Sequence, residues 1–196
     1  MSVVDQLAPD ALISHAWRLV GDEPLGTAAH ALDLRRAVSS AYYAVFHEVC
    51  HRTAGQVTGR GRYTVTIPDV VVAHLVRAIP HRAVATACRQ VEALRKTRPD
   101  NRWTNERVAA WHLVHVDPPN PPSVHLCAFA IALVKSLDFR QLADYDRLAV
   151  IEYDDAANAV DAAERALVTL REDGDTPAFQ GFFTLVAMAA RGSMRA

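Results

Sequence analysis

The protein has 196 residues, of which 51% are hydrophobic and 7% aromatic, and its formal net charge at pH 7 is −1. A chain of this length can bury one full hydrophobic core, so we expect a single domain over residues 1–196. The near-neutral charge excludes a global positive field that would attract nucleic acid, and no stretch approaches the roughly 20 apolar residues of a membrane span.

Helical periodicity dominates the chain and predicts an all-α fold. The one extended β-branched stretch, residues 63–67, is short. Elsewhere apolar residues recur at helical spacing between Gly and Pro boundaries. In chain order, the predicted helices cover residues 10–20, 27–54, 69–79, 81–96, 104–115, 123–143, 154–172 and 177–191. Segments 69–79 and 81–96 are two pieces of one element broken at Pro80, and 104–115 lies in an insertion, so we expect an antiparallel bundle of about five to seven helices.

Two segments are predicted to add to this bundle. Residues 97–122 are rich in proline and are interpreted as an ordered insertion around a short helix. Residues 177–191 form an extra C-terminal helix, which Pro177 begins.

The cysteines and the N-terminus predict a cytoplasmic protein. Cys50, Cys88 and Cys127 are odd in number, far apart in the sequence and set among apolar residues, which is typical of buried, reduced thiols. The first nine residues lack the basic stretch and apolar run of a secretory signal. Neither secretion nor a membrane anchor is expected.

The predicted helix over residues 27–54 has two opposite faces. At 100° per residue, an apolar stripe predicted to enter the core is formed by Ala31, Leu34, Val38, Ala41, Tyr42, Val45 and Val49. The opposite stripe carries Arg36, Ser40, Tyr43 and His47. A polar stripe is usually a solvated face. This one, however, combines a cation, a hydroxyl, a phenol and a titratable imidazole, which favours a binding groove or a subunit contact.

Residues 36–47, RAVSSAYYAVFH, resemble the signature helix of bacterial HEPN proteins. A second block, residues 140–146 (RQLADYD), resembles the motif that closes a later helix in the same family. With their flanking helices, the two blocks cover about two thirds of the chain. The resemblance implies a HEPN-like bundle of the toxin–antitoxin and RNA-processing type.

The second block also indicates a site from its residues alone. Six residues lie near one stripe of the predicted helix: Phe129, Leu133, Ser136, Leu137, Arg140 and Asp144. Arg140 and Asp144 thus extend an apolar face, and a charge that points inward needs a partner. The pair is either a structural salt bridge that holds the helix end or part of a functional site.

The resemblance implies a homodimer and an activity. Many HEPN proteins are metal-independent endoribonucleases whose site is Arg, four to six residues, then His. They cleave RNA by 2′-OH transesterification, with no cofactor or metal. In this chain the resemblance implies that Arg140 neutralises the charge on the phosphate and that Asp144 orients Arg140. It also implies that RNA is bound by Arg36, Ser40, Tyr43 and Tyr145.

The sequence departs from the family pattern in one respect. No histidine follows Arg140 within range, and Tyr145 stands where a catalytic imidazole is expected. Either His47 supplies the imidazole, or the protein is a non-catalytic HEPN module that binds a nucleotide or a protein. A minimal nucleotidyltransferase antitoxin is the protein partner that the family context suggests.

Two other motifs compete with this interpretation. Arg107 and His112 match Arg-x4-His literally, but they lie in the proline-flanked insertion and form a rival site. His47, Glu48 and His51 match the zinc-binding pattern H-E-x-x-H and would make the protein a zinc hydrolase. The chain around them shows no third ligand, so no metal is expected.

Overall fold

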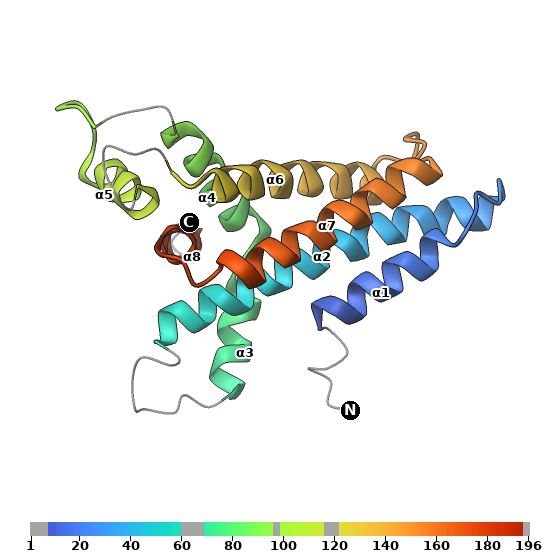
Figure 1. The fold of residues 1–196 in the computed structure, drawn as a ribbon, viewed down its shortest axis with the longest axis horizontal. Coiled ribbons are helices and arrows are strands. Elements are labelled where there is room, and N and C mark those ends of the chain that lie inside the picture. The colour runs from blue at the N-terminus through green and yellow to red at the C-terminus, as the bar shows by residue number, and fades with distance from the viewer. Residues whose placement is uncertain (1–7, 60–68, 96–98, 116–121, 194–196) are drawn as a thin grey trace. The chain divides into compact units, whose positions relative to one another are not determined.

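The computed structural model describes residues 8–59, 69–95, 99–115 and 122–193, and within these ranges every regular element is an α-helix (Figure 1). This confirms the predicted all-α class. The predicted β-branched stretch, residues 63–67, lies outside the described residues. The helices are α1 (Pro9–Val20), α2 (Ala28–Thr58), α3 (Asp69–Ala78), α4 (His81–Leu94), α5 (Asn105–Val114), α6 (Val124–Tyr145), α7 (Tyr153–Asp173) and α8 (Pro177–Ser193). None of these described helices is long and apolar enough to cross a membrane.

The number of helices differs from the prediction. Eight helices lie within the described residues, where a bundle of five to seven was expected. The count includes α3 and α4 as separate helices, because Pro80, where the break was predicted, has extended backbone angles. It also includes α5, the short helix expected inside the insertion, whose first turn is capped by the Thr104 hydroxyl accepting from the Arg107 backbone N–H at 3.3 Å.

The end of α2 was predicted one turn too early. The helix was predicted to end at residue 54, with Gly55 as the stop, but α2 continues to Thr58. A Cβ at Gly55 would meet nothing within 4 Å and Gly55 has no positive φ, so it is an ordinary residue of the helix interior and does not end the helix. Gly59 ends the helix instead, because it adopts a φ of +64°, which costs other residues free energy.

The chain forms two compact units. The first unit comprises residues 1–48 and 132–170, and the second comprises residues 49–131 and 171–196. The prediction of a single domain over the whole chain stays a prediction. The core of the first unit includes Ile13, Val20, Leu34, Val38, Ala41, Tyr42, Val45, Leu133, Leu137, Val160 and Leu167. The apolar stripe predicted on α2 is therefore buried, except Ala31, which is exposed in the second turn of the helix.

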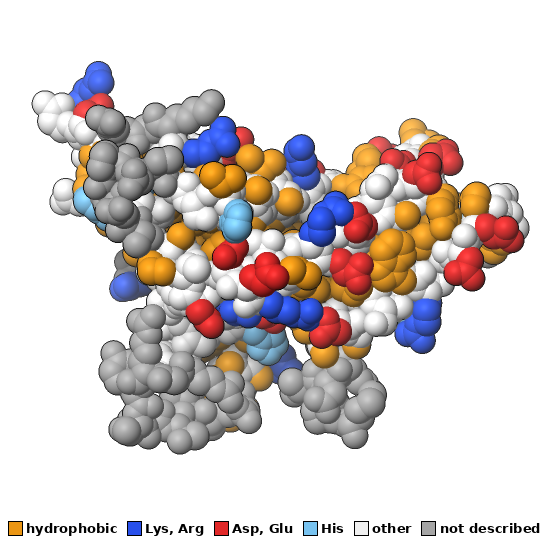
Figure 2. Space-filling model, viewed as in Figure 1, with side chains coloured by type: hydrophobic (Ala, Val, Ile, Leu, Met, Phe, Trp, Pro, Cys, Tyr) orange, Lys and Arg blue, Asp and Glu red, His pale blue; other side chains and the backbone are white. Residues whose placement is uncertain are grey.

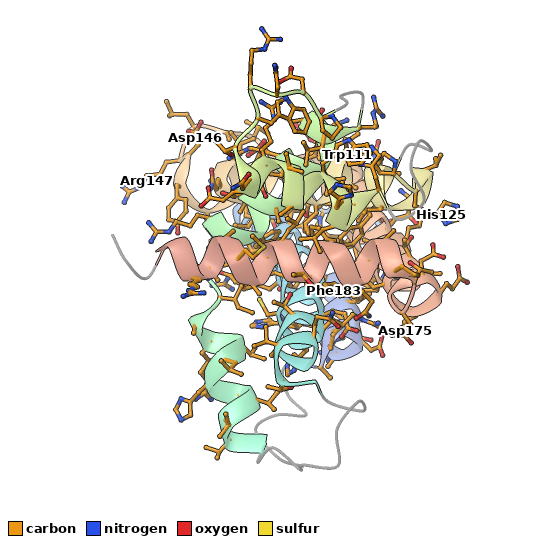
Figure 3. All side chains as sticks on the ribbon, turned by 90° about the vertical axis from the view of Figure 1, so that its left-hand side faces the viewer. Trp111, His125, Asp146, Arg147, Asp175 and Phe183 are labelled. Carbon is orange, nitrogen blue, oxygen red and sulfur yellow. The ribbon has the colours of Figure 1, made fainter. Side chains whose placement is uncertain are left out.

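The core of the second unit is built around α8, which packs against α4 and α5. Phe179, Phe182 and Phe183 of α8 are almost completely buried, and Phe129 lies edge-on to the first two, with ring centroids 5.5 and 5.8 Å apart. Figure 3 shows α8 with Phe183, and Trp111 on α5. The three phenylalanines of α8 supply the large apolar area that holds these helices together.

α5 and α8 cross at a glycine. A Cβ at Gly181 would overlap the carbonyl oxygen of Leu113 and lie 2.7 Å from its carbonyl carbon. Only a residue without a side chain allows the two backbones to come this close.

The three cysteines are free and buried, as predicted. Burial raises the pKa of the Cys50 and Cys88 thiols to about 12, and it also raises the pKa of Cys127. They therefore stay protonated in the folded protein.

Candidate functional site

Arg140 is the centre of a polar cluster in the first unit. Its side chain is 12% exposed, and its Nη2 donates a hydrogen bond of 2.7 Å to the Tyr43 hydroxyl. Its Nε lies 2.6 Å from Asp144 Oδ2. The guanidinium carbon is 5.2 Å from the ring centroids of both Tyr43 and Tyr145. The i,i+4 pair predicted from the sequence is thus formed.

The contact between Arg140 and Asp144 is an ion pair rather than a hydrogen bond. The buried Nε has no hydrogen-bond acceptor in suitable geometry among the described residues, although the carboxylate oxygen is close. The attraction therefore rests on charge and distance.

The surroundings of Arg140 keep it charged. Burial alone would lower its pKa, because a charged group is less well solvated inside the protein. Tyr43, Asp144 and Tyr145 outweigh this effect and raise the pKa above its ordinary value. The cluster thus presents a permanent cation.

Asp144 is fixed from its other side by Ser39. The Ser39 hydroxyl donates to Asp144 Oδ1 and also lies 3.3 Å from the carbonyl oxygen of Arg35, one turn earlier on α2. Because one carboxylate oxygen meets Ser39 and the other meets Arg140, Asp144 links α2 to the end of α6.

Arg35 provides a second link between α2 and the segment after α6. Its guanidinium donates to the carbonyl oxygen of Ala149 at 2.6 Å and to that of Asp146. These contacts fix the turn that follows Tyr145. Sequence reasoning placed neither Arg35 nor Ser39 in the site.

Arg36 and Ser40, which were predicted to bind RNA, lie outside the cluster. The Arg36 side chain is 70% exposed and pairs with Asp33 of the same helix at 3.7 Å. Ser40 is half-buried and makes no side-chain hydrogen bond within the described residues. The face of α2 that meets α6 is rotated by one residue from the predicted one.

Residues spaced four apart along α2 mark the observed face. Arg35, Ser39, Tyr43 and His47 follow one another at i,i+4 along α2, and the first three contact the end of α6 or the turn after it. Residues at this spacing are neighbours on a helix surface. Tyr43 and His47 belong to both the predicted and the observed rows.

His47 lies one turn after Tyr43 on α2. Its half-buried ring stacks on the Tyr43 ring, with centroids 6.0 Å apart and planes 28° apart. Tyr43 thus contacts both His47 and Arg140. The structure brings together Arg140, Asp144, Tyr43, Tyr145 and His47 of the predicted site residues.

The rival pair is not brought together. Arg107 and His112 lie five residues apart on α5, so their side chains point about 140° apart around the helix axis. Arg107 lines a cavity with Leu94 and Leu185, whereas His112 lines a different cavity with Asp175. An Arg–His site of the family type is not formed there.

The zinc motif has no third ligand in the part of the chain that the structure describes. His47 and Glu48 are half-buried on α2, and His51 is exposed one turn later. Among the described residues, no group of three His, Cys, Asp or Glu side chains could hold a metal ion. A catalytic zinc needs three protein ligands, so nothing in the geometry favours a zinc hydrolase.

The sequence matches no protein-family model, no curated protein and no solved structure. Function is therefore inferred from the cluster around Arg140 and from the resemblance of its two sequence blocks.

Proposed function

We propose that the protein is a HEPN-type, metal-independent endoribonuclease that cleaves RNA by 2′-OH transesterification. One observation carries this proposal: Tyr43 contacts Arg140 through a 2.7 Å hydrogen bond and His47 through a stacked ring. A phosphodiester that binds over Tyr43 can then meet a cation and an imidazole at the same time. These are the two groups that the reaction needs.

The reaction assigns a role to each residue of the cluster. His47 takes the proton of the ribose 2′-OH, and the oxygen attacks the adjacent phosphorus. The 5′-oxygen of the next nucleotide leaves and takes up a proton from water, so that the products are a 2′,3′-cyclic phosphate and a 5′-hydroxyl. Arg140 neutralises the charge that develops on the non-bridging oxygens. Asp144, which Ser39 holds, is a positioning residue for Arg140.

An exposed apolar surface beside Arg140 supports the proposed homodimer. Leu142, Tyr145, Leu148 and Val150 are 40, 71, 91 and 74% exposed. Figure 2 shows hydrophobic side chains beside acidic ones over the turn between α6 and α7. Large apolar side chains gathered in this way are typical of a contact surface. A dimer through the helices bearing residues 36–47 and 123–146 would cover them, and light scattering tests it.

The activity is tested with single-stranded RNA in the presence of EDTA. We expect cleavage that leaves 2′,3′-cyclic phosphate ends. Arg140→Ala and His47→Ala should each lower the rate by roughly 10²–10³-fold, because each removes a group that acts on the transition state. Arg36→Ala is the matched control, since this exposed arginine lies on the same helix but outside the cluster.

Three results would contradict the proposal. The first is RNA that stays intact in EDTA at high protein concentration. The second is full activity in either Arg140→Ala or His47→Ala with an unchanged circular dichroism spectrum. The third is an equal loss of activity in Arg36→Ala.

A specific observation favours a second candidate, the non-catalytic HEPN module. Arg140 is only 12% exposed, and both Nε and Nη2 already face protein groups. Such an arginine can serve to hold a surface for a nucleotide or a protein, for example a minimal nucleotidyltransferase antitoxin. Tight binding of a partner without any RNA cleavage, weakened by Tyr145→Ala or Leu148→Ala, would favour this candidate.

A further inference from the structure

Three helices of the second unit line an open cavity that the proposed ribonuclease does not use. α8 packs against α4 and α5, and α4 also contacts α5. The cavity between them measures about 510 Å³. Sites for small organic molecules have volumes of roughly 300–1,000 Å³, so a small molecule fits this space.

The floor of the cavity is apolar. Leu94 of α4, Ala110 of α5 and Leu185 of α8 line it, and each is at most 5% exposed. Met188 lines the same cavity but is 44% exposed. A methionine has a flexible, polarisable side chain that adapts to different apolar partners. The floor and Met188 therefore suit a flexible apolar body.

Arg107 supplies a cation to the same cavity. Its guanidinium lies 4.1 Å above the centre of the Trp103 ring, a cation–π contact that limits its orientations. Within the described residues, this guanidinium has no carboxylate partner and no hydrogen-bond acceptor. Its N–H groups are thus oriented but unused. A guanidinium in this state matches a carboxylate, which it binds through two parallel hydrogen bonds.

Two other arginines of the second unit already have carboxylate partners. Arg102 already pairs with Asp100 at 3.2 Å, and Arg52 pairs with Asp175 at 3.7 Å. Arg107 combines an unused guanidinium with an apolar cavity, which a ligand with both an anionic group and an apolar body would satisfy.

Glu106 limits the charge of that ligand. It lines the cavity beside Arg107 and is exposed. The Glu106 carboxylate at the mouth of the cavity repels a ligand with two or more negative charges more strongly than a ligand with one. The balance of one arginine and one glutamate therefore favours a monoanion over a phosphate ester or an RNA backbone.

We infer that the cavity between α4, α5 and α8 binds a small apolar monocarboxylate, with Arg107 holding the carboxylate and the floor around Leu185 holding the apolar chain. This site lies in the second unit and does not depend on the proposed ribonuclease activity.

The test uses the full chain and isothermal titration with sodium decanoate below its micellar concentration. We expect one molecule bound per chain, decanol to bind at least about tenfold more weakly, and decyl phosphate to bind more weakly than decanoate. Arg107→Gln should weaken decanoate binding at least about tenfold, because it removes a charged hydrogen bond. Glu106→Gln should narrow the difference in affinity between decyl phosphate and decanoate.

Two further variants locate the site. Ala93 lines the cavity but is exposed, so Ala93→Trp should fill the space without disturbing the core and should abolish binding. Arg77→Gln removes an exposed arginine of α3 that does not line the cavity, and binding should be unchanged. Arg140→Ala should also bind decanoate normally, whatever happens to RNA cleavage.

The inference is overturned by any of three results: no decanoate binding at millimolar concentration, binding that persists in Arg107→Gln, or binding that persists in Ala93→Trp. Equal losses in Arg107→Gln and Arg77→Gln would also overturn it, because they would reveal a general charge effect.

Discussion

Arg140 and Arg107 lie over aromatic rings in two different units, but they differ in what else they touch. Arg140 is 12% exposed and meets Asp144 and Tyr43, whereas Arg107 is exposed and its guanidinium lies over the ring of Trp103. The first arginine is held by the protein. The second is oriented by one aromatic ring and has no carboxylate partner among the described residues.

Helix geometry explains this difference better than the literal motif does. The Arg-x4-His spacing at Arg107 and His112 separates the two side chains by about 140°, so they do not converge. The i,i+4 spacing at Arg140 and Asp144 places both on one face, where they pair at 2.6 Å. A literal match to a catalytic pattern therefore indicates a site only where the local structure brings the two side chains together.

The largest predicted effect tests the region around Arg107. Gly181→Ala should destabilise the protein by about 3 kcal/mol, because its Cβ would overlap backbone atoms of Leu113 that cannot move away without separating α5 from α8. Gly55→Ala is the matched control. It should stabilise the protein by about 0.5–1 kcal/mol, since its Cβ meets open space inside a helix.

Urea unfolding measures both glycine variants. If Gly181→Ala unfolds at the same urea concentration as the wild type, α5 and α8 do not cross at this residue, and the cavity beside them loses its structural basis.

The next effect tests whether Arg140 is held as described. Asp144→Ala should destabilise the protein by about 2 kcal/mol, because it removes the carboxylate that pairs with a largely buried charge and accepts from Ser39. Asp161→Ala is the matched control, since it also forms an i,i+4 pair but with the 67% exposed Arg165, and the change should stay within about 0.5 kcal/mol. Equal effects of the two variants would mean that Arg140 is no better held than a surface arginine.

A smaller effect compares the two arginines through their aromatic partners. Tyr43→Phe keeps the ring but removes the oxygen that accepts from Arg140, and it should cost about 1 kcal/mol of the free energy of unfolding. Arg107→Ala should change that free energy by less than about 0.5 kcal/mol, because no hydrogen bond or ion pair is lost. Denaturation curves that reverse this order would contradict the contrast between the two sites.

The sequence predicted the parts of this contrast that depend on local pattern. Helix type and most boundaries followed from apolar spacing and from Pro80 and Gly21. Gly55 misled the prediction, because a glycine in a helix interior and one in the left-handed region look alike in sequence, and only Gly59 has a positive φ.

The candidate site was predicted in part, because some of its residues follow a local helical pattern. Arg140, Asp144, Tyr43 and His47 share helix faces that a helical wheel shows. Arg35 and Ser39 were missed because their partners lie more than 100 residues away, at the end of α6 and in the turn after it. The direction in which a helix meets its neighbour is set by tertiary packing, and a wheel alone does not contain it.

The last predicted effect concerns pH and compares His115, a buried neutral group, with the permanently charged Arg140. His115 is 4% exposed, its ring stacks on Trp111 with centroids 4.1 Å apart, and its Nδ1 lies 3.0 Å from the Trp111 carbonyl oxygen, to which Nδ1–H donates. Burial lowers the pKa of His115, the hydrogen bond to Trp111 opposes this, and the nearby His112 lowers the pKa further, so the net pKa is below its ordinary value of 6.5.

This lowered pKa gives the sign of the pH dependence. As the pH falls below about 6.5, the unfolded chain protonates His115 before the folded protein does, so the unfolded state binds more protons. Stability contributed by the neutral imidazole is therefore complete above that pH and is lost as the pH falls toward the folded pKa, with a slope of at most about 1.4 kcal/mol per pH unit. His115→Gln cannot take up this proton, so its free energy of unfolding should fall less steeply between pH 7 and pH 5 than that of the wild type. Any loss of stacking on Trp111 would lower the curve of this variant equally at every pH and leave its slope unaffected. Urea titrations at several pH values measure the slope, and parallel curves for the two proteins would show that His115 is not buried in its neutral form. Arg140→Ala, which removes a group that stays charged throughout this range, should leave the contribution of His115 to the slope in place.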